Sequence, residues 1–150
     1  MIIGIATLGP FGRLPAPGTW GSALGALWWV YVVHPLTSGR AGYHEVSFDL
    51  LVILAAVCFC GAAAELIGRK DPSEVILDEF ACMPLALAGL QHVEWSWILA
   101  YFLLFRLLDI TKPFGIRRLE KLPFGIGIVA DDVAAALLTN GILHVVRLFV

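Results

Sequence analysis

Long apolar runs separated by short charged clusters are the feature of this sequence that most restricts its fold. Residues 48–68 form the clearest run, because only Asp49 near its start and Glu65 near its end interrupt it. About 20 consecutive apolar residues are enough for a helix to cross a bilayer. The pattern predicts an all-α fold, an integral membrane helical bundle with about four to five spans or re-entrant segments. The other apolar runs cover residues 23–36, 80–90, 95–108 and 133–150.

The small share of charged residues also favours a membrane protein. Of the 150 residues, 59% are hydrophobic and 15% are charged, whereas a soluble domain has about 25% charged residues. The length corresponds to a single domain, residues 1–150. The net charge is −2, and no basic cluster is interleaved with aromatic residues, so nucleic-acid binding is not expected.

Charged residues are concentrated on either side of a short linker near the C-terminus. Arg106, Asp109 and Lys112 precede the linker, and the adjacent pair Asp131 and Asp132 follows it. Two adjacent carboxylates repel each other unless a cation, a proton or a helix N-terminus relieves them. Mg²⁺ suits one or two carboxylates together with a phosphate, and Arg and Lys suit the phosphate itself. The pattern therefore predicts metal-assisted phosphate chemistry beside a membrane.

A second polar cluster, residues 69–79, contains Asp71, Asp78 and Glu79. The last two lead into an apolar run, where acidic residues gain from the helix dipole, so a capping role is one interpretation. A carboxylate pair that enters a membrane segment is costly and tends to be functional, so a place in the metal site is the other interpretation.

A third segment, residues 12–22, is rich in Pro and Gly, and this composition predicts that it forms no regular helix. Such a loop can direct backbone N–H groups and the hydroxyls of Thr19 and Ser22 at an anion. The alternative is a simple N-cap on the helix that follows.

The distribution of Lys and Arg predicts one orientation in the membrane. If Arg13 lies in the cytoplasm, eight of the ten Lys and Arg residues lie there too, and only Arg40 and Arg147 lie outside. The same threading brings all three polar clusters to the cytoplasmic face. We therefore expect a multi-pass protein with a cytoplasmic site.

Other chemistries are excluded or weakened by spacing. A thiol phosphatase needs an Arg six residues after its cysteine, where this chain has Ala64, Leu66 and Ala88. The three cysteines, of which Cys58 and Cys60 lie in an apolar run, are expected to be core residues without a disulfide. The signature of CDP-alcohol phosphotransferases is absent. A small membrane transporter stays an alternative, although it would place its acidic residues in mid-span.

The clusters together resemble the phosphatidylglycerophosphatase A family. The matching stretches, in the family's order, are residues 17–22, 70–72, 75–79, 105–113 and 125–132. The resemblance implies an all-helical, Mg²⁺-dependent hydrolase of the bacterial inner membrane. Its substrate would be phosphatidylglycerophosphate, and its product phosphatidylglycerol, in phospholipid biosynthesis. Cys82, Leu108 and Phe114 depart from the family's usual residues, but none of them removes a charged or hydroxyl group.

The resemblance also implies roles for the carboxylates. Asp131, Asp78 and Asp109 are expected to be catalytic, with Asp131 or Asp78 as the proton acceptor. Which carboxylates hold the metal directly, and whether one or two ions bind, stays open. The expected pool of Mg²⁺ ligands is Asp71, Asp78, Glu79, Asp109, Asp131 and Asp132.

The substrate phosphate is expected to bind basic and hydroxyl residues. Arg106 and Lys112 each lie three residues from Asp109, so salt bridges within one helix are the alternative to phosphate binding. The lipid tails would stay in the bilayer, and the sequence leaves the oligomeric state open. The full set of expected phosphate contacts is Thr19, Ser22, Arg106, Lys112 and Lys70.

Overall fold

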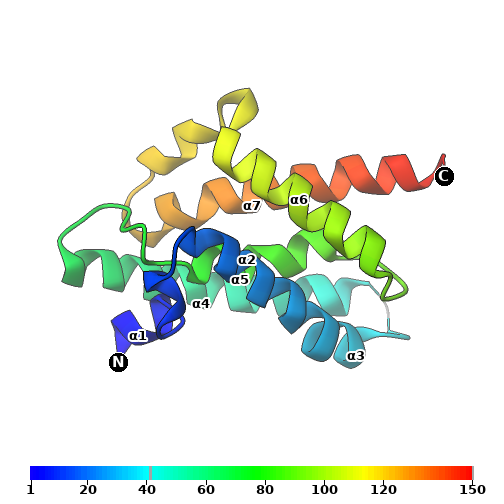
Figure 1. The fold of residues 1–150 in the computed structure, drawn as a ribbon, viewed down its shortest axis with the longest axis horizontal. Coiled ribbons are helices and arrows are strands. Elements are labelled where there is room, and N and C mark those ends of the chain that lie inside the picture. The colour runs from blue at the N-terminus through cyan, green and yellow to red at the C-terminus, as the bar shows by residue number, and fades with distance from the viewer. Residues whose placement is uncertain (41, 150) are drawn as a thin grey trace.

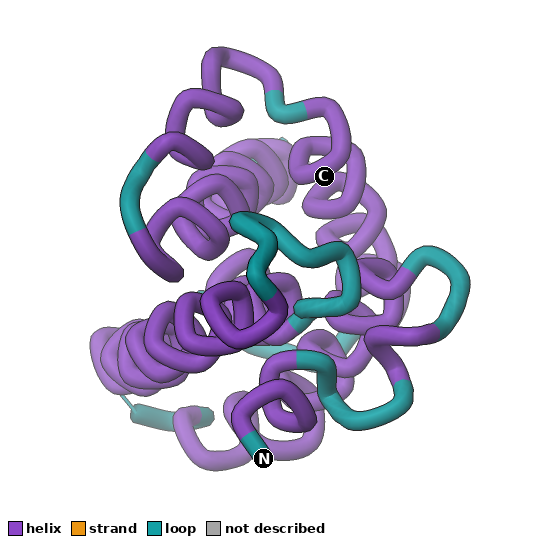
Figure 2. Tube along the Cα trace, turned by 90° about the vertical axis from the view of Figure 1, so that its left-hand side faces the viewer, coloured by secondary structure: helices purple, strands orange, loops and turns teal. Residues whose placement is uncertain are grey.

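The computed structural model describes residues 1–40 and 42–149, and within them every regular element is helical (Figures 1 and 2). This confirms the all-α prediction. The elements in chain order are α1 (Ile2–Ala6), the 3₁₀-helix η1 (Phe11–Arg13), α2 (Pro17–Trp28), the π-helical turn η2 (Trp29–Val33), α3 (His34–Thr37), α4 (Tyr43–Ile67), α5 (Leu77–Leu87), α6 (Trp95–Thr111), the 3₁₀-helix η3 (Pro113–Lys121) and α7 (Phe124–Arg147).

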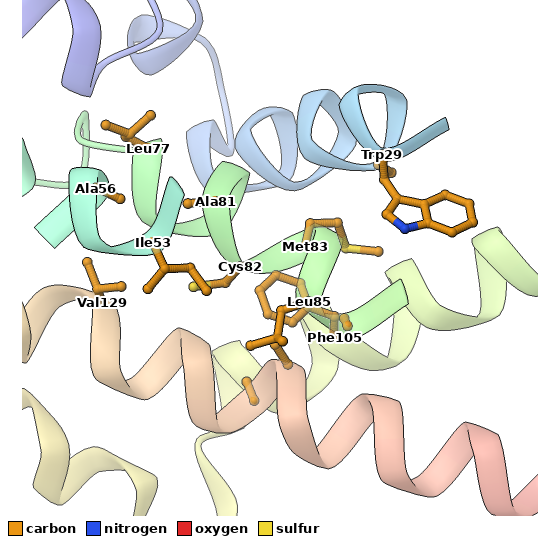
Figure 3. Packing of buried hydrophobic residues seen from close by; sticks show 14 of the residues in the cluster. Trp29, Ile53, Ala56, Leu77, Ala81, Cys82, Met83, Leu85, Phe105 and Val129 are labelled. Carbon is orange, nitrogen blue, oxygen red and sulfur yellow. The ribbon is translucent and has the colours of Figure 1, made fainter. Parts of the chain in front are cut away.

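Helix α5 lies at the centre of the bundle. It contacts α2, α4, α6 and α7, and all of its residues except Glu79 and Phe80 are buried. Its apolar side chains, such as Met83 and Leu85, pack with Phe105 of α6 and with residues of α4 and α7 (Figure 3). A helix that is buried on all sides is expected to be apolar all round. Asp78 and Glu79 in the first turn of α5 are therefore exceptions to this expectation.

The start of α2 corrects an expectation from the sequence. Residues 12–22 were expected to contain no regular helix, but α2 begins at Pro17. Proline is tolerated in a first turn because the N–H that it lacks has no partner there. The preceding Ala16 has a left-handed conformation, with φ of 54°. Gly21 suits this helix because a Cβ there would lie 2.7 Å from the carbonyl oxygen of Ile76, so glycine lets α2 approach α5 closely.

In the described part of the chain, two helices, α4 and α7, are long and apolar enough to cross a membrane by their length and composition. The expectation of four to five spans is not confirmed. Helix α2 passes into a π-helical turn, and α5 and α6 have 11 and 17 residues, fewer than the roughly 20 that cross a bilayer.

Candidate active site

The three polar clusters meet at one end of the bundle. The first turns of α2 and α5, the last turns of α6 and the first half of α7 converge where α7 begins, at the left of Figure 1. A cavity of about 250 Å³ lies among them. The residues expected to act there that line it are Asp71, Asp78, Glu79, Arg106, Asp109, Lys112, Asp131 and Asp132. The whole expected set of metal ligands therefore shares one cavity.

Helix α5 supplies Asp78 and Glu79 from its first turn, where the helix dipole favours negative charge. Burial raises the pKa of Asp78, and the neighbouring carboxylate of Glu79 raises it further. Burial also raises the pKa of Glu79, although Arg106 opposes this shift. Asp78 Oδ1 and Glu79 Oε2 are buried and have no hydrogen-bond partner among the described residues. Capping alone does not account for such a pair, because both oxygens lack a donor.

Helix α7 supplies Asp131 and Asp132. The sequence placed them just before an apolar run that begins at residue 133, but α7 begins at Phe124, so both lie inside the helix. Both are buried, with exposed fractions of 4% and 3%. Within the described structure, Asp131 Oδ1 and Asp132 Oδ2 have no hydrogen-bond partner.

Arg106 of α6 joins the carboxylates of two helices. Its Nη1 donates to Asp109 Oδ2 at 2.6 Å and lies 3.7 Å from Glu79 Oε1. It also donates to the buried hydroxyl of Ser22 at 3.4 Å. Its Nε–H is buried and has no partner among the described residues. The expected salt bridge within the helix is present, and the guanidinium still lines the cavity.

Lys112 follows α6 in a left-handed conformation, with φ of 45°, and it turns toward α7 rather than toward Asp109. Its Nζ donates to Asp131 and, at 2.7 Å, to Glu120 Oε1. Burial alone would lower the pKa of Lys112, but these two hydrogen bonds outweigh it and raise the pKa above its usual value. Sequence reasoning missed Glu120, since its approach to Lys112 depends on the non-helical turn at Phe114 and Gly115.

The carboxylates form two overlapping groups. One oxygen each of Asp78, Glu79 and Asp132 lies within 4.8 Å of the others, and the same holds for Asp109, Asp131 and Asp132. Asp132 belongs to both groups. Oxygen ligands at this density, several of them without a donor, fit a hard divalent cation such as Mg²⁺.

The other expected phosphate contacts lie outside the cavity lining. Thr19 is exposed, and its phosphate contact stays a prediction. Ser22 is fully buried, where it donates to the Gly18 carbonyl and accepts from Arg106, so it positions that guanidinium. Lys70 is exposed and lines neighbouring cavities. Ser73 lines the acidic cavity, although no sequence pattern indicated it.

Carboxylates that can hold a divalent cation and basic residues that can bind a phosphate therefore meet around one cavity of a helical bundle, as in proteins that act on phosphate esters. A sequence model of the family described as Phosphatidylglycerophosphatase A matches residues 4–147. The chain belongs to the phosphatidylglycerophosphatase A family, and it is a phosphatase.

Three curated relatives are consistent with this assignment. The chain is 38% identical over 130 residues to a phosphatidylglycerophosphatase A of Haemophilus influenzae. The matched residues make up 82% of this chain and 74% of that protein. It is 34% identical over 99 residues to the Escherichia coli protein of the same name, covering 63% and 58% of the two chains. A Bacteroides thetaiotaomicron protein named putative phosphatidylinositol-3-phosphatase is 31% identical over 134 residues, covering 88% and 84%. No solved structure matches.

Proposed function

We propose that this protein hydrolyses phosphatidylglycerophosphate to phosphatidylglycerol and phosphate, with Mg²⁺ bound in the acidic cavity. The observation that carries the proposal is the meeting of six carboxylates with Arg106 and Lys112 around one cavity. Family membership supplies the substrate. A transporter would be expected to distribute such carboxylates along a path, and here they converge at one end of the bundle.

The residues that would hold Mg²⁺ are the two overlapping carboxylate groups that share Asp132. The unpartnered oxygens of Asp78, Glu79, Asp131 and Asp132 support this assignment, because a buried carboxylate oxygen without a donor is costly unless a cation compensates it. When bound, the ion would polarise the phosphoryl oxygens and lower the pKa of a bound water.

The side chains of this chain perform the remaining steps. Arg106, held by Asp109 and Ser22, presents its unpartnered Nε–H and binds the phosphate. Lys112 adds a second positive charge to the cavity lining. Asp131 or Asp78 accepts the proton of the attacking water. Lys112 donates a hydrogen bond to Asp131 and so orients that carboxylate.

The membrane placement is part of the proposal. Large apolar side chains are exposed on the outer faces of three helices, for example Leu54 of α4 at 61%, Leu103 of α6 at 57% and Leu137 of α7 at 56%. Exposed apolar surface on this scale suits lipid. We place the protein in the bacterial inner membrane as a multi-pass protein, with the site toward the cytoplasm and the substrate's acyl chains in the bilayer.

The test is phosphate release from phosphatidylglycerophosphate by the purified protein in detergent, with Mg²⁺ and with EDTA. We expect release only with Mg²⁺, and we expect Asp131→Asn to lose it while keeping its helical content. Phosphatidylinositol 3-phosphate belongs in the same assay because of the named activity of the Bacteroides relative. If the folded protein releases no phosphate with Mg²⁺ present, the proposed activity is wrong.

A further inference from the structure

A second cavity adjoins the acidic one. It has a volume of about 310 Å³ and is lined mainly by η3 and by the segment that follows α4. Asp71 and Ile128 line both cavities. The hydrogen bond from Lys112 to Glu120 also joins them, because Lys112 lines the first cavity and Glu120 the second. The two cavities therefore share a wall.

The second cavity carries excess positive charge. Lys70, Arg117 and Lys121 line it, and none of them has a carboxylate within 4.0 Å in the described structure. Two carboxylates, Asp71 and Glu120, also line it, so three cations face two anions. Glu120 forms an ion pair with Lys112 of the acidic cavity. Three cations without an ion-pair partner around one concavity are suited to an anion, and Arg and Lys are the usual phosphate-binding side chains.

A third cavity, of about 320 Å³, continues the series. Lys70 lines both the second and the third cavity. The other residues that line the third cavity are Gly61, Ala64, Glu65, Gly68, Arg69 and Phe124. Phe124 is half exposed, at the start of α7. From the first cavity to the third, the lining thus changes from mainly acidic to mainly basic, and then to a mixture of charged residues with the apolar Ala64 and Phe124.

This order matches the order of groups along the proposed substrate. Phosphatidylglycerophosphate carries a terminal phosphomonoester, then one glycerol unit, then a phosphodiester, and then the diacylglycerol. If the acidic cavity takes the terminal phosphate, the phosphodiester must lie in an adjoining space. Resting on the proposed function, we propose that Lys70, Arg117 and Lys121 bind the phosphodiester and select lipids that carry it next to a phosphomonoester.

The proposal gives Lys70 a different partner from the one expected from the sequence. Lys70 was expected to bind the phosphate that is removed, but it does not line the acidic cavity. Its place at the junction of the second and third cavities suits the phosphate that remains with the lipid.

The test uses two inhibitors that each carry only one of the phosphate groups. Phosphatidylglycerol retains the phosphodiester, and inorganic phosphate resembles the group that is removed. The variant Arg117→Gln/Lys121→Gln is compared with the wild-type protein in micelles of an uncharged detergent. Arg118→Gln is the matched control, because Arg118 is exposed on the same η3 segment but lines neither cavity.

For the double variant we expect the KM for phosphatidylglycerophosphate and the Ki of phosphatidylglycerol to rise about tenfold, the size typical of a lost charge-assisted hydrogen bond. The kcat and the Ki of inorganic phosphate should stay within about twofold. Arg118→Gln should change none of these values.

Three results would overturn the inference. The first is an unchanged Ki of phosphatidylglycerol in the double variant. The second is a rise in that Ki in Arg118→Gln as large as in the double variant. The third is a rise in the Ki of inorganic phosphate in the double variant as large as the rise for phosphatidylglycerol. The second of them would indicate general attraction of anionic lipid, and the third a disturbed acidic cavity. Hydrolysis of phosphatidylglycerophosphate by the wild-type protein is measured first. No hydrolysis at that stage would contradict the proposed function, whereas hydrolysis that the double substitution leaves unchanged would contradict only the phosphodiester site.

Discussion

Arg106 connects three helices at the site. Its guanidinium contacts Asp109 on its own helix, Glu79 at the start of α5 and Ser22 within α2. A Cβ at Gly18 would lie 2.1 Å from Glu79 Oε1 and 3.0 Å from an Arg106 nitrogen, so the backbone of α2 closes directly over this pair. One side chain therefore contacts the buried carboxylate of Asp109 and the partly buried carboxylate of Glu79 while it also lines the cavity.

We expect Arg106→Lys to lower kcat/KM for phosphatidylglycerophosphate by about 100-fold, because an ammonium keeps the charge but loses the planar fork that orients the phosphate. The measurement is steady-state phosphate release. Arg13→Lys, an exposed position outside the cavity, serves as the control and should retain full activity. Equal activity of the two variants would contradict the phosphate-binding role of Arg106.

At the scale of the helices, the sequence indicated the existence of elements better than their boundaries. The apolar runs at 80–90 and 95–108 correspond to α5 and α6, because composition alone reveals segments withdrawn from water. The beginnings of α2 and α7 were placed too late. Both helices begin with glycine-containing turns that look like loops in sequence, and those glycines are needed because a neighbouring helix approaches them.

The crossing of α4 and α7 illustrates that packing. A Cβ on Gly125 would lie 1.8 Å from the carbonyl oxygen of Val57 and 2.8 Å from the nitrogen of Gly61, both of them backbone atoms that cannot turn aside. Because α7 carries Asp131 and Asp132, the same contact fixes the depth at which these carboxylates enter the cavity.

We therefore expect Gly125→Ala to destabilise the protein by about 1 to 3 kcal/mol, the usual range for overpacking, and to lower activity as α7 moves away from α4. Gly141→Ala in the same helix is the matched control, since nothing lies within 4 Å of its added Cβ. That change should stabilise the protein by about 0.5 to 1 kcal/mol through helix propensity. Thermal unfolding in detergent, followed by circular dichroism, measures both. A neutral Gly125→Ala would show that the crossing adjusts freely.

At the scale of the whole molecule, the sequence indicated the composition of the site but not its partition into cavities. Four of the six acidic residues form two adjacent pairs, and adjacent carboxylates in an apolar chain indicate a shared cation. Asp71 and Asp109 joined them through the family resemblance. The sequence could not predict that Lys70 lines a different cavity from Arg106 and Lys112, because all three are basic residues near the ends of apolar runs. Glu120 and Ser73 gave no signal, because their places depend on how η3 and the segment after α4 fold over the bundle.

Residues of four helices line the site, so an ion bound there should stabilise the folded bundle in addition to its role in catalysis. Asp78 and Glu79 come from α5, Asp109 from α6, and Asp131 and Asp132 from α7, with α2 closing the cavity. Without a cation these carboxylates repel one another across helix boundaries, and the repulsion opposes packing. Mg²⁺ at 100 times its Kd would raise the free energy of unfolding by about 2.7 kcal/mol.

We expect Mg²⁺ to raise the Tm of the wild-type protein by about 5 to 10 °C over its value in EDTA, as that free energy implies for a chain of this size. NaCl at matched ionic strength should give a much smaller change, since it screens charge without bridging the helices. Asp132→Asn should lose most of the Mg²⁺ effect, because Asp132 belongs to both carboxylate groups. Asp49→Asn, a buried carboxylate on α4 outside the acidic cavity, should keep it. The same Tm in Mg²⁺ and in EDTA would mean that no divalent cation joins these helices.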